Sequence, residues 1–292
     1  MGGCDNVSAH WIAPLIDGAL MGFVYGVAAM GLTLIWGVMR VVNLAHGAIM
    51  ALGMFAAYLL VTGLGINPYL ALAAVALIGL ICGVGMYWVA VHRVISAPYL
   101  STLLATFAVN MMLIGAGTAL FTTTPRNLDF SMRTVRIGPL ALPGARLMAA
   151  GVAVLLTAAL YLFLYRTRTG KAIRAVASNR AAAELMGIPS AKMLALSFGI
   201  GAMLASVAGG LIATIFPFNI LSGEAYQTRS FVVCVLGGLG NPLGALVGGL
   251  LLGLLEGGIP AFMPVSWVPV VEFALFVLVL LIRPTGLLGG ER

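Results

Sequence analysis

Long apolar runs, separated by short polar breaks, occupy nearly the whole chain. A helix needs about 20 apolar residues to cross the hydrocarbon core of a membrane. The candidate runs cover residues 14–37, 43–64, 68–91, 99–121, 147–165, 190–215, 229–239, 241–259 and 266–283, and the run 229–239 is too short to cross alone. This pattern predicts an all-α, polytopic integral membrane protein with 8–9 transmembrane helices and with broken or short segments near 38–47 and 229–240.

The composition supports this class of protein. The chain is 62% hydrophobic and 8% charged, whereas soluble domains carry about 25% charged residues. A formal charge of +7 would suggest a nucleic-acid partner in a soluble protein, but here the cations stand near the ends of the apolar runs, without an aromatic and basic patch. We therefore expect contact with membrane lipid, no nucleic acid, and a single transmembrane domain over residues 1–292.

One loop concentrates positive charge. Residues 166–192 carry several cations and a single acid, Glu184. Loops rich in Lys and Arg stay on the cytoplasmic side, so this loop is expected inside, with the N-terminus outside and the C-terminus inside. The same rule leaves four cations in an outer loop, where they are not expected: Arg126, Arg133, Arg136 and Arg146.

The charged loop also carries helix signals. Ser178 or Asn179 can cap a helix start, Arg180 and Glu184 are one turn apart, and Gly187 followed by proline is a stop signal. A short exposed helix on the cytoplasmic face suggests a docking element. The alternative is a loop that only sets the orientation of the chain.

A second polar interruption lies in the block Gly37 to Gly47, GVMRVVNLAHG. Asn43 and His46 mark either a broken helix near a solute path or a turn at the cytoplasmic surface, because polar groups at membrane depth are costly unless protein or a cavity satisfies them. The spacing favours the turn, and Arg40 places the block near the cytoplasmic surface. We expect Asn43, His46 and Gly47 at the inner end of the path.

Other polar and small residues allow two interpretations each. Thr102, Thr106 and Asn110 share one helical face and either line the path or satisfy backbone groups. Asp17, Glu256 and Glu272 stand near run ends, and they either mark the solute path or simply reach the membrane interface. Two glycine series either pack helices closely or face a path or partner: Gly18, Gly22, Gly26 and Gly244, Gly248, Gly249, Gly253, Gly257.

Several catalytic motifs are absent from the sequence. It has no G-x-x-x-x-G-K-[ST] phosphate loop, so the chain is not expected to hydrolyse ATP. It also has no H-E-x-x-H, no G-x-S-x-G and no cluster of Cys and His ligands. We therefore expect no enzyme activity and no bound metal.

Three blocks in order along the chain resemble the LivH-type permeases of high-affinity branched-chain amino acid ABC importers. They are GLTLIWGVMRVVNLAHG (31–47), RTRTGKAIRAVASNRAAAELMGI (166–188) and FVVCVLGGLGNPLGALVGGLLLGLLE (231–256). The resemblance implies a multi-pass permease of the bacterial inner membrane. Its implied partners are a LivM-type second permease, two cytoplasmic ATPases of the LivG and LivF types that hold ATP and Mg²⁺, and a periplasmic substrate-binding protein.

The resemblance also assigns the coupling helix, which seats in a groove of an ATPase. It corresponds here to Ser178, Asn179, Arg180, Ala181, Ala182, Ala183, Glu184, Leu185, Met186 and Gly187. The three alanines would allow close seating, and Arg180 and Glu184 would supply polar contacts. Asn179, Ala181 and Ala48 stand where relatives often carry charged residues, which changes the expected pairing with the ATPase and the chemistry of the path.

The implied function is import of leucine, isoleucine and valine. Similar permeases carry urea, short amides or aromatic acids, and the sequence does not separate these solutes. The alternative class is an ATP-independent secondary transporter or channel with a broken helix at the bilayer midplane. The docking helix, and the lack of an evident intramembrane acid pair for ion coupling, favour the ATP-driven class.

Overall fold

The computed structural model describes residues 4–128, 130, 132–137, 140–283 and 285–289. Within them, eight helices are long and apolar enough to cross a membrane. The α-helices are α1 (Cys4–Met39), α2 (His46–Leu64), α3 (Pro68–Met86), α4 (Tyr99–Phe121), α5 (Gly144–Arg166), α6 (Arg168–Ser178), α7 (Arg180–Leu185), α8 (Ser190–Ala213), α9 (Ser222–Gly237), α10 (Pro242–Gly258) and α11 (Val268–Ile282). A π-helical turn, Tyr87–Val91, extends α3, and a hairpin joins β1 (Val135–Ile137) to β2 (Leu140–Leu142).

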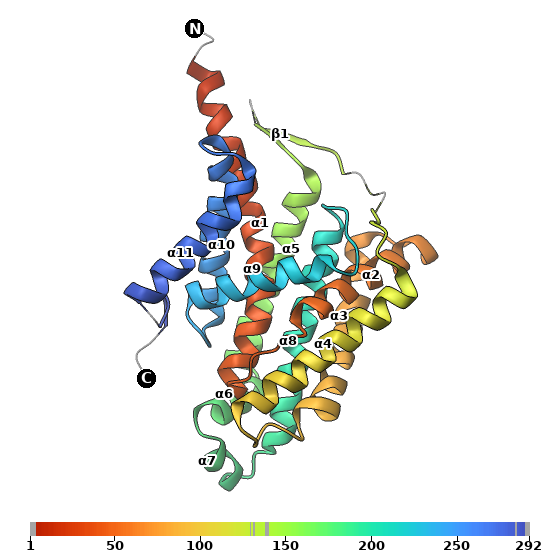
Figure 1. Cartoon of the computed structure of the whole chain (residues 1–292), viewed down its shortest axis with the longest axis vertical. Coiled ribbons are helices and arrows are strands. Elements are labelled where there is room, and N and C mark those ends of the chain that lie inside the picture. Colours follow the sequence, from red (N-terminus) through yellow and green to blue (C-terminus); the bar gives the residue numbers. More distant parts are fainter. Residues whose placement is uncertain (1–3, 129, 131, 138–139, 284, 290–292) are drawn as a thin grey trace.

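The predicted spans agree closely with the observed helices, and the all-α class is confirmed. The short segment differs, because α9 begins at Ser222 rather than at 229. Glu224 and Arg229 interrupt the apolar pattern there, so the sequence hides the first half of the helix. The structure accommodates these charges, and α9 crosses the bundle obliquely without being one of the candidate spans (Figure 1).

Helices α1 and α8 form the centre of the bundle. Of the most apolar part of each span, 83% is buried in α1 and 89% in α8, but only 11% in α4 and in α11. Helices α2 and α3 pack on α8 through small residues, and a Cβ built on Gly53 would lie 2.1 Å from the Ser206 carbonyl oxygen. The poorly buried helices are left to face lipid or other subunits.

Both glycine series pack helices closely, which confirms the packing interpretation. Gly249, Gly253 and Gly257 meet the series on α1, whereas Gly244 and Gly248 meet α9. A Cβ built on Gly18 would lie 2.2 Å from the Gly253 carbonyl oxygen, and one on Gly22 would lie 2.6 Å from that of Gly249. Since the hydrophobic effect cannot drive helices together in lipid, such close backbone approach supplies the packing energy. The seam joins α1 to α10 along much of their length.

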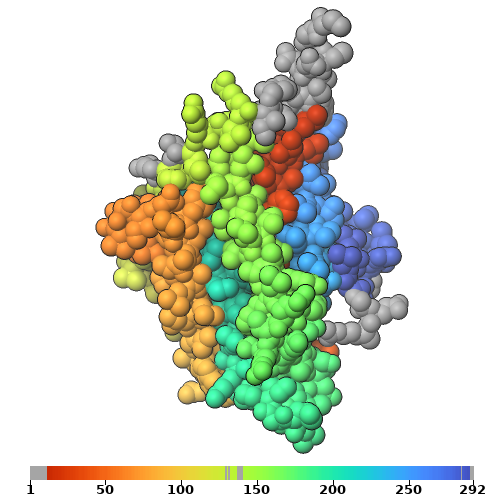
Figure 2. All heavy atoms as spheres, turned by 180° about the vertical axis from the view of Figure 1, so that it is seen from behind, coloured from red at the N-terminus to blue at the C-terminus, as the bar shows by residue number. Residues whose placement is uncertain are grey.

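Most of the cations gather at one end of the bundle, where α1, α3 and α5 end and α8 begins. There α6 and α7 close the end over a small apolar cluster that includes Ile35, Tyr87, Val176, Ala183 and Leu194. This is the lower end in Figure 1, opposite the N-terminus and the hairpin. Figure 2 shows α6 and α7 at the same end from behind.

Two of the cations predicted at the outer end have partners that explain their position. Arg146 forms an ion pair with Asp17 on α1. The Arg126 backbone pairs with Phe218, and its guanidinium lies over the Tyr58 ring, 5.3 Å from the centroid. These contacts hold the two arginines against the bundle. They explain why both lie at the outer end, where the rule for positive charge does not expect them.

Candidate coupling and transport sites

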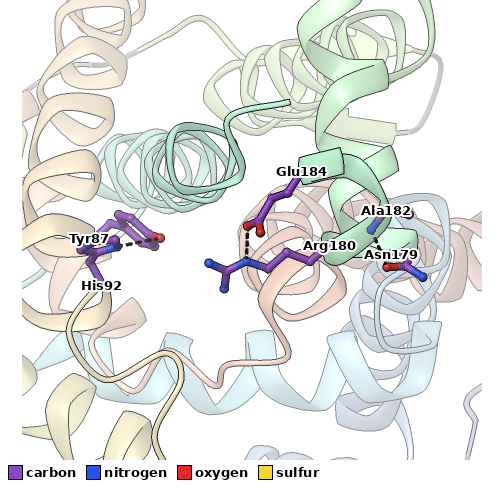
Figure 3. A network of polar contacts seen from close by, with 6 residues as sticks. All are labelled: Tyr87, His92, Asn179, Arg180, Ala182 and Glu184. Atoms are coloured by element: carbon purple, nitrogen blue, oxygen red, sulfur yellow. Dashed lines mark hydrogen bonds and ion pairs between the residues drawn. The ribbon is translucent and has the colours of Figure 1, made fainter. Parts of the chain in front are cut away.

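The charged loop folds as two helices rather than one. Ser178 is the last residue of α6. Asn179 is the N-cap of α7, and its Oδ1 accepts a hydrogen bond of 3.0 Å from the Ala182 amide. The Arg180 Nε donates to Glu184 Oε1 at 3.0 Å (Figure 3). Gly187 has φ +79° and ends the element, as the stop signal predicted. The cap, the ion pair and the stop are confirmed.

The side chains of α7 divide between the bundle and the exterior. Ala183 is buried against the bundle, so it cannot help the helix to seat in a partner, as was expected of all three alanines. Ala181 and Ala182 are exposed. Leu185 is 89% exposed and Met186 82% exposed. Two large apolar side chains at the tip of a charged loop form a patch suited to a protein groove.

Hydrogen bonding from Arg180 lowers the pKa of Glu184 below its usual value of 4.5. The carboxylate is therefore ionised at neutral pH, and the pair with Arg180 is present there. In Figure 3 the Arg180 guanidinium extends from α7 toward the π-helical turn, where the Tyr87 hydroxyl lies 3.4 Å from His92 Nδ1. A π-turn in an otherwise regular helix often occurs at a functional site.

The expected surface turn is instead a segment that re-enters the bundle. Arg40 ends α1 with φ +54°, residues 40–45 are not helical, and α2 begins at His46. His46 lies beside Gly31, whose built Cβ would be 3.4 Å from the His46 Cε1. Because Gly31 lies eight residues before Met39, this is roughly 12 Å from the end of α1. The prediction of a cytoplasmic surface turn is wrong, and the alternative of a broken helix is the better description.

Asn43 and His46 are both buried at this depth. Asn43 Oδ1 accepts a hydrogen bond of 3.1 Å from the Ala45 amide, but its Nδ2 has no partner in the described part of the chain. The His46 ring faces the Ala28 carbonyl and Gly31, and neither ring nitrogen makes a hydrogen bond there. Unsatisfied polar groups are rare in stable cores.

A cavity of about 380 Å³ lies between the re-entrant segment, α4 and α9. Its lining combines apolar side chains with three uncharged polar residues: Leu32, Val42, Asn43, Leu44, Tyr99, Leu103, Gln227, Thr228 and Phe231. Gln227 also binds the start of α2, because its Oε1 accepts from the Gly47 amide at 3.0 Å. Asn43 and Gly47 are thus brought together with α9 residues that the sequence analysis missed.

The remaining pathway candidates do not line this cavity. Thr102 donates to Tyr99 O at 2.8 Å, and Thr106 lies near carbonyl oxygens of its own helix. Thr106 is also 3.1 Å from Val42 O, so it ties α4 to the re-entrant segment. Asn110 is half-buried farther along α4. The threonines satisfy backbone groups, which was the second interpretation.

An ionic cluster surrounds Arg229 of α9, and the sequence analysis missed it. Arg229 pairs with Glu256 at 3.0 Å, donates to the Tyr25 hydroxyl at 3.0 Å and lies 5.4 Å and 5.7 Å from the Tyr25 and Tyr226 ring centroids. Glu272 of α11 is buried and interacts electrostatically with Arg229. The interpretation that Glu256 and Glu272 simply reach the membrane interface is therefore wrong. Two acids do share one intramembrane cluster.

Comparisons with known proteins identify the family of the chain. The family described as "Branched-chain amino acid transport system / permease component" matches residues 15–280. The chain belongs to this family. It is 32% identical to the permease BraD of Pseudomonas aeruginosa and 30% identical to LivH of Escherichia coli K12, each over 96% of both chains. Both relatives are described as permeases of high-affinity branched-chain amino acid transport systems.

The family also reaches permeases for other solutes. The ribose import permease RbsC of Escherichia coli is 29% identical over 81% of this chain and 74% of its own length. No solved structure matches the chain. Membership therefore makes the protein a multi-pass permease component, a transport subunit rather than an enzyme, and leaves its solute to be argued from the site.

Proposed function

We propose that this chain is one permease subunit of an ATP-driven importer for branched-chain amino acids. It would work with a second permease of the LivM type, two cytoplasmic ATPases that bind ATP and Mg²⁺, and a periplasmic binding protein in the bacterial inner membrane. The observation that carries the proposal is α7, a capped helix that projects Leu185 and Met186 from the most cationic end of the bundle. A permease with no phosphate loop cannot hydrolyse ATP itself, so it needs such an element to transmit the movement of an ATPase to its helices.

In this proposal, α7 inserts its tip into a groove of an ATPase. Leu185 and Met186 enter the groove, and Ala181 and Ala182 allow close approach on the exposed side. Ala183 holds the helix to α8 and the end of α3. A rigid connection of this kind passes a displacement of α7 directly to the bundle, because packed interiors transmit strain.

The solute path follows the outer face of α9 in this proposal. Glu224 and Thr228 are exposed on α9, one turn apart. They nevertheless lie at membrane depth, because the neighbouring Arg229 contacts Tyr25 at the middle of the α1 span. A carboxylate at membrane depth is costly when it faces lipid. The second permease would therefore cover this face, and the cavity beside Asn43 would open into the space between the two permeases.

Asn43 supplies a free amide donor beside that cavity. A donor that has no protein partner can bond a carboxylate or a carbonyl of a passing solute and then release it at little cost. The surrounding Leu32, Leu103 and Phe231 suit an apolar side chain. This combination favours a small amphiphilic solute such as leucine over ribose, whose surface is polar all round.

Uptake by proteoliposomes tests the whole assignment. The permease pair, the ATPases and the binding protein should accumulate radiolabelled leucine with ATP, and this chain alone should accumulate none. Leu185→Asp should abolish ATP-driven uptake while the purified permease keeps its thermal stability, because an exposed residue contributes little to the fold. Lys171→Ala, on the exposed side of α6, is the control and should leave uptake unchanged.

A second candidate function is an ion-coupled transporter, and the Arg229 cluster favours it. Glu256 and Glu272 place two acids near one arginine within the bundle, as a proton or sodium carrier would require. The two functions differ in their energy source. Leucine uptake by this chain alone under a proton or sodium gradient, without ATP, would establish the carrier and exclude the importer.

A further inference from the structure

A second cavity, of about 460 Å³, lies at the cationic end of the bundle and has no part in the proposed solute path. The ends of α1 and α5, helix α6 and the turn before α10 enclose it. Two arginines, Arg40 and Arg174, line it together with apolar and small residues, and no acid is among its lining residues: Leu34, Gly37, Val38, Leu164, Tyr165, Ile173, Ala177, Ser178, Gly240 and Pro242. Its charge suits an anion.

The depth of the cavity matches the boundary between lipid tails and headgroups. Arg40 directly follows the α1 span, which ends at Met39, and Tyr165 is in the last turn of the α5 span. Arginine and tyrosine are suited to this boundary, because each has an apolar body and a polar tip. Helix α6 lies across the same boundary, with Ile173 and Val176 buried and Arg174 exposed.

The two guanidinium groups are free to bind a ligand. Arg174 is held in place because its Nε donates to Leu164 O at 3.2 Å and its guanidinium lies 4.3 Å from the Tyr165 ring centroid. Its terminal nitrogens and the whole Arg40 guanidinium have no hydrogen bond or ion pair in the described part of the chain. A fixed guanidinium with free terminal N–H groups is suited to binding a phosphate with two parallel hydrogen bonds.

The backbone at Arg40 adds an independent observation. Its φ of +54° lies in the left-handed region, which favours glycine at the end of a helix. An arginine is disfavoured there, because its Cβ crowds the backbone in this region. Its side chain makes no hydrogen bond or ion pair in the described residues that would offset this cost, so an external ligand is a physical reason for its presence.

A narrow groove continues from this cavity along the bundle. It shares Leu164, Tyr165 and Pro242 with the cavity and runs between α5 and α10 past Met30 and Leu160. The groove is shallow, with a free volume of about 20 Å³, so it cannot enclose an acyl chain. Helix α5 lies at the surface of this face (Figure 2), and its apolar side chains Leu155 and Leu162 are exposed. A charged cavity at the headgroup level beside an exposed apolar helix suits one phospholipid whose acyl chain lies on that helix.

We propose that Arg40 and Arg174 bind the phosphate of an anionic phospholipid whose acyl chain lies along α5. The cytoplasmic leaflet is rich in anionic lipid. The site joins α1, α5, α6 and the turn before α10, so a bound lipid would brace the support of α7. This role is separate from the solute path and does not depend on which solute is carried.

The test uses the full chain purified in detergent and titrated with phosphatidylglycerol or phosphatidylcholine. Bound lipid is counted by native mass spectrometry, and the shift in thermal stability is measured in parallel. We expect Arg40→Gly and Arg174→Gln each to weaken phosphatidylglycerol binding about tenfold, because each loses a charge-assisted hydrogen bond to the phosphate, and the pair to weaken it about 100-fold. Arg40→Gly suits the left-handed backbone, so a folding defect should not obscure the result.

The matched control is the double variant Arg168→Gln with Lys171→Gln. It removes two cations, as the test pair does, but both lie on α6 outside the cavity, and the variant should retain phosphatidylglycerol as the unaltered chain does. Equal loss in this control, or equal binding of phosphatidylcholine, would reduce the effect to general surface charge and overturn the site. Inorganic phosphate that displaces the lipid at equal concentration would indicate a free-anion pocket instead.

Discussion

The seam between α1 and α10 and the region around α9 are built in opposite ways. Along the seam, glycine backbones meet so closely that a Cβ on Gly18 would lie 2.2 Å from the carbonyl oxygen of Gly253. Around α9, a broken segment, a cavity and the unpaired Asn43 amide lie together. The seam leaves no room for movement, whereas the α9 region holds polar groups that can change partners.

The difference separates a rigid scaffold, the α1–α10 seam, from the α9 region, which the proposal places on the solute path. Close backbone packing gives a stiff pair of long helices, and α1 carries the re-entrant segment at one end and Tyr25 of the ionic cluster at its middle. The rigid helix α1 thus positions the polar groups of α9, while the cavity beside them leaves them room to change partners. Substitutions in the seam or in the ion pair that ties α9 to it should therefore affect folding, and substitutions of the unpaired polar groups beside the α9 cavity should affect transport.

The largest effect is expected from Gly253→Leu. Its side chain would enter the backbone of Gly18 and Gly22, and because no flexible side chain can give way, the cost should reach or exceed the about 3 kcal/mol typical of severe overpacking. The variant should fail to accumulate in the membrane, or should lose thermal stability strongly in detergent. Gly151→Leu is the control, since nothing lies within 4 Å of its built Cβ. Equal loss in both variants would mean that the seam has no special role.

The next effect is expected from Arg229→Met, which leaves Glu256 and Glu272 without their cation. Breaking a fully buried pair costs about 3–5 kcal/mol, and the partial exposure of Arg229 and Glu256, 25% and 27%, reduces this to roughly 1–3 kcal/mol. The measurement is thermal unfolding of the purified chain.

The double variant Arg229→Met with Glu256→Gln sharpens this prediction. It removes the unpaired carboxylate of Glu256 and should recover part of the stability that Arg229→Met loses. If the double variant is less stable than the single one, Glu256 has a favourable partner other than Arg229, and the cluster must be described differently.

The sequence predicted the scaffold well because its signals are local. Apolar run lengths located the spans, and the cap at Asn179 and the stop at Gly187 located α7. The glycine spacing indicated close packing, but only the structure shows which helix meets which. Each of these features depends on residues within a few turns of one another, which is the range over which a sequence pattern can be interpreted.

The α9 region was predicted poorly because its contacts are remote. Arg229 and Tyr25 are 204 residues apart, so no local pattern links them. The depth of Asn43 was misjudged because Arg40 marks where α1 ends but not the direction in which the chain continues. Charges within α9 concealed its start, since the residue that neutralises Arg229 lies on α10.

Asn43→Ala should separate stability from transport. The Nδ2 group has no partner to lose, and the Oδ1 bond to the Ala45 amide is a single neutral hydrogen bond worth about 0.5–1.5 kcal/mol. Thermal stability should therefore change little, while leucine uptake by the assembled importer should fall. Because Asn43 lines the cavity at depth rather than the surface, the ranking of accepted solutes should change as well. A uniform reduction for every solute would place Asn43 at a gate outside the recognition site.

The smallest effect is expected from Glu184→Gln, which removes an ion pair of the same length as that of Arg229 but on an exposed helix. Exposed ion pairs contribute little to stability, because solvent screens them, so thermal stability should not change measurably at pH 7. The pKa of Glu184 is lowered by Arg180, so the pair is present above the unfolded value of 4.5 and is lost as the pH falls through the lower folded value. Titration of Glu184 should therefore cause no pH dependence of uptake between about pH 6 and 8. A loss of ATP-driven uptake in Glu184→Gln with unchanged stability would show that the carboxylate contacts the ATPase itself, and would extend the working surface of α7 beyond Leu185 and Met186.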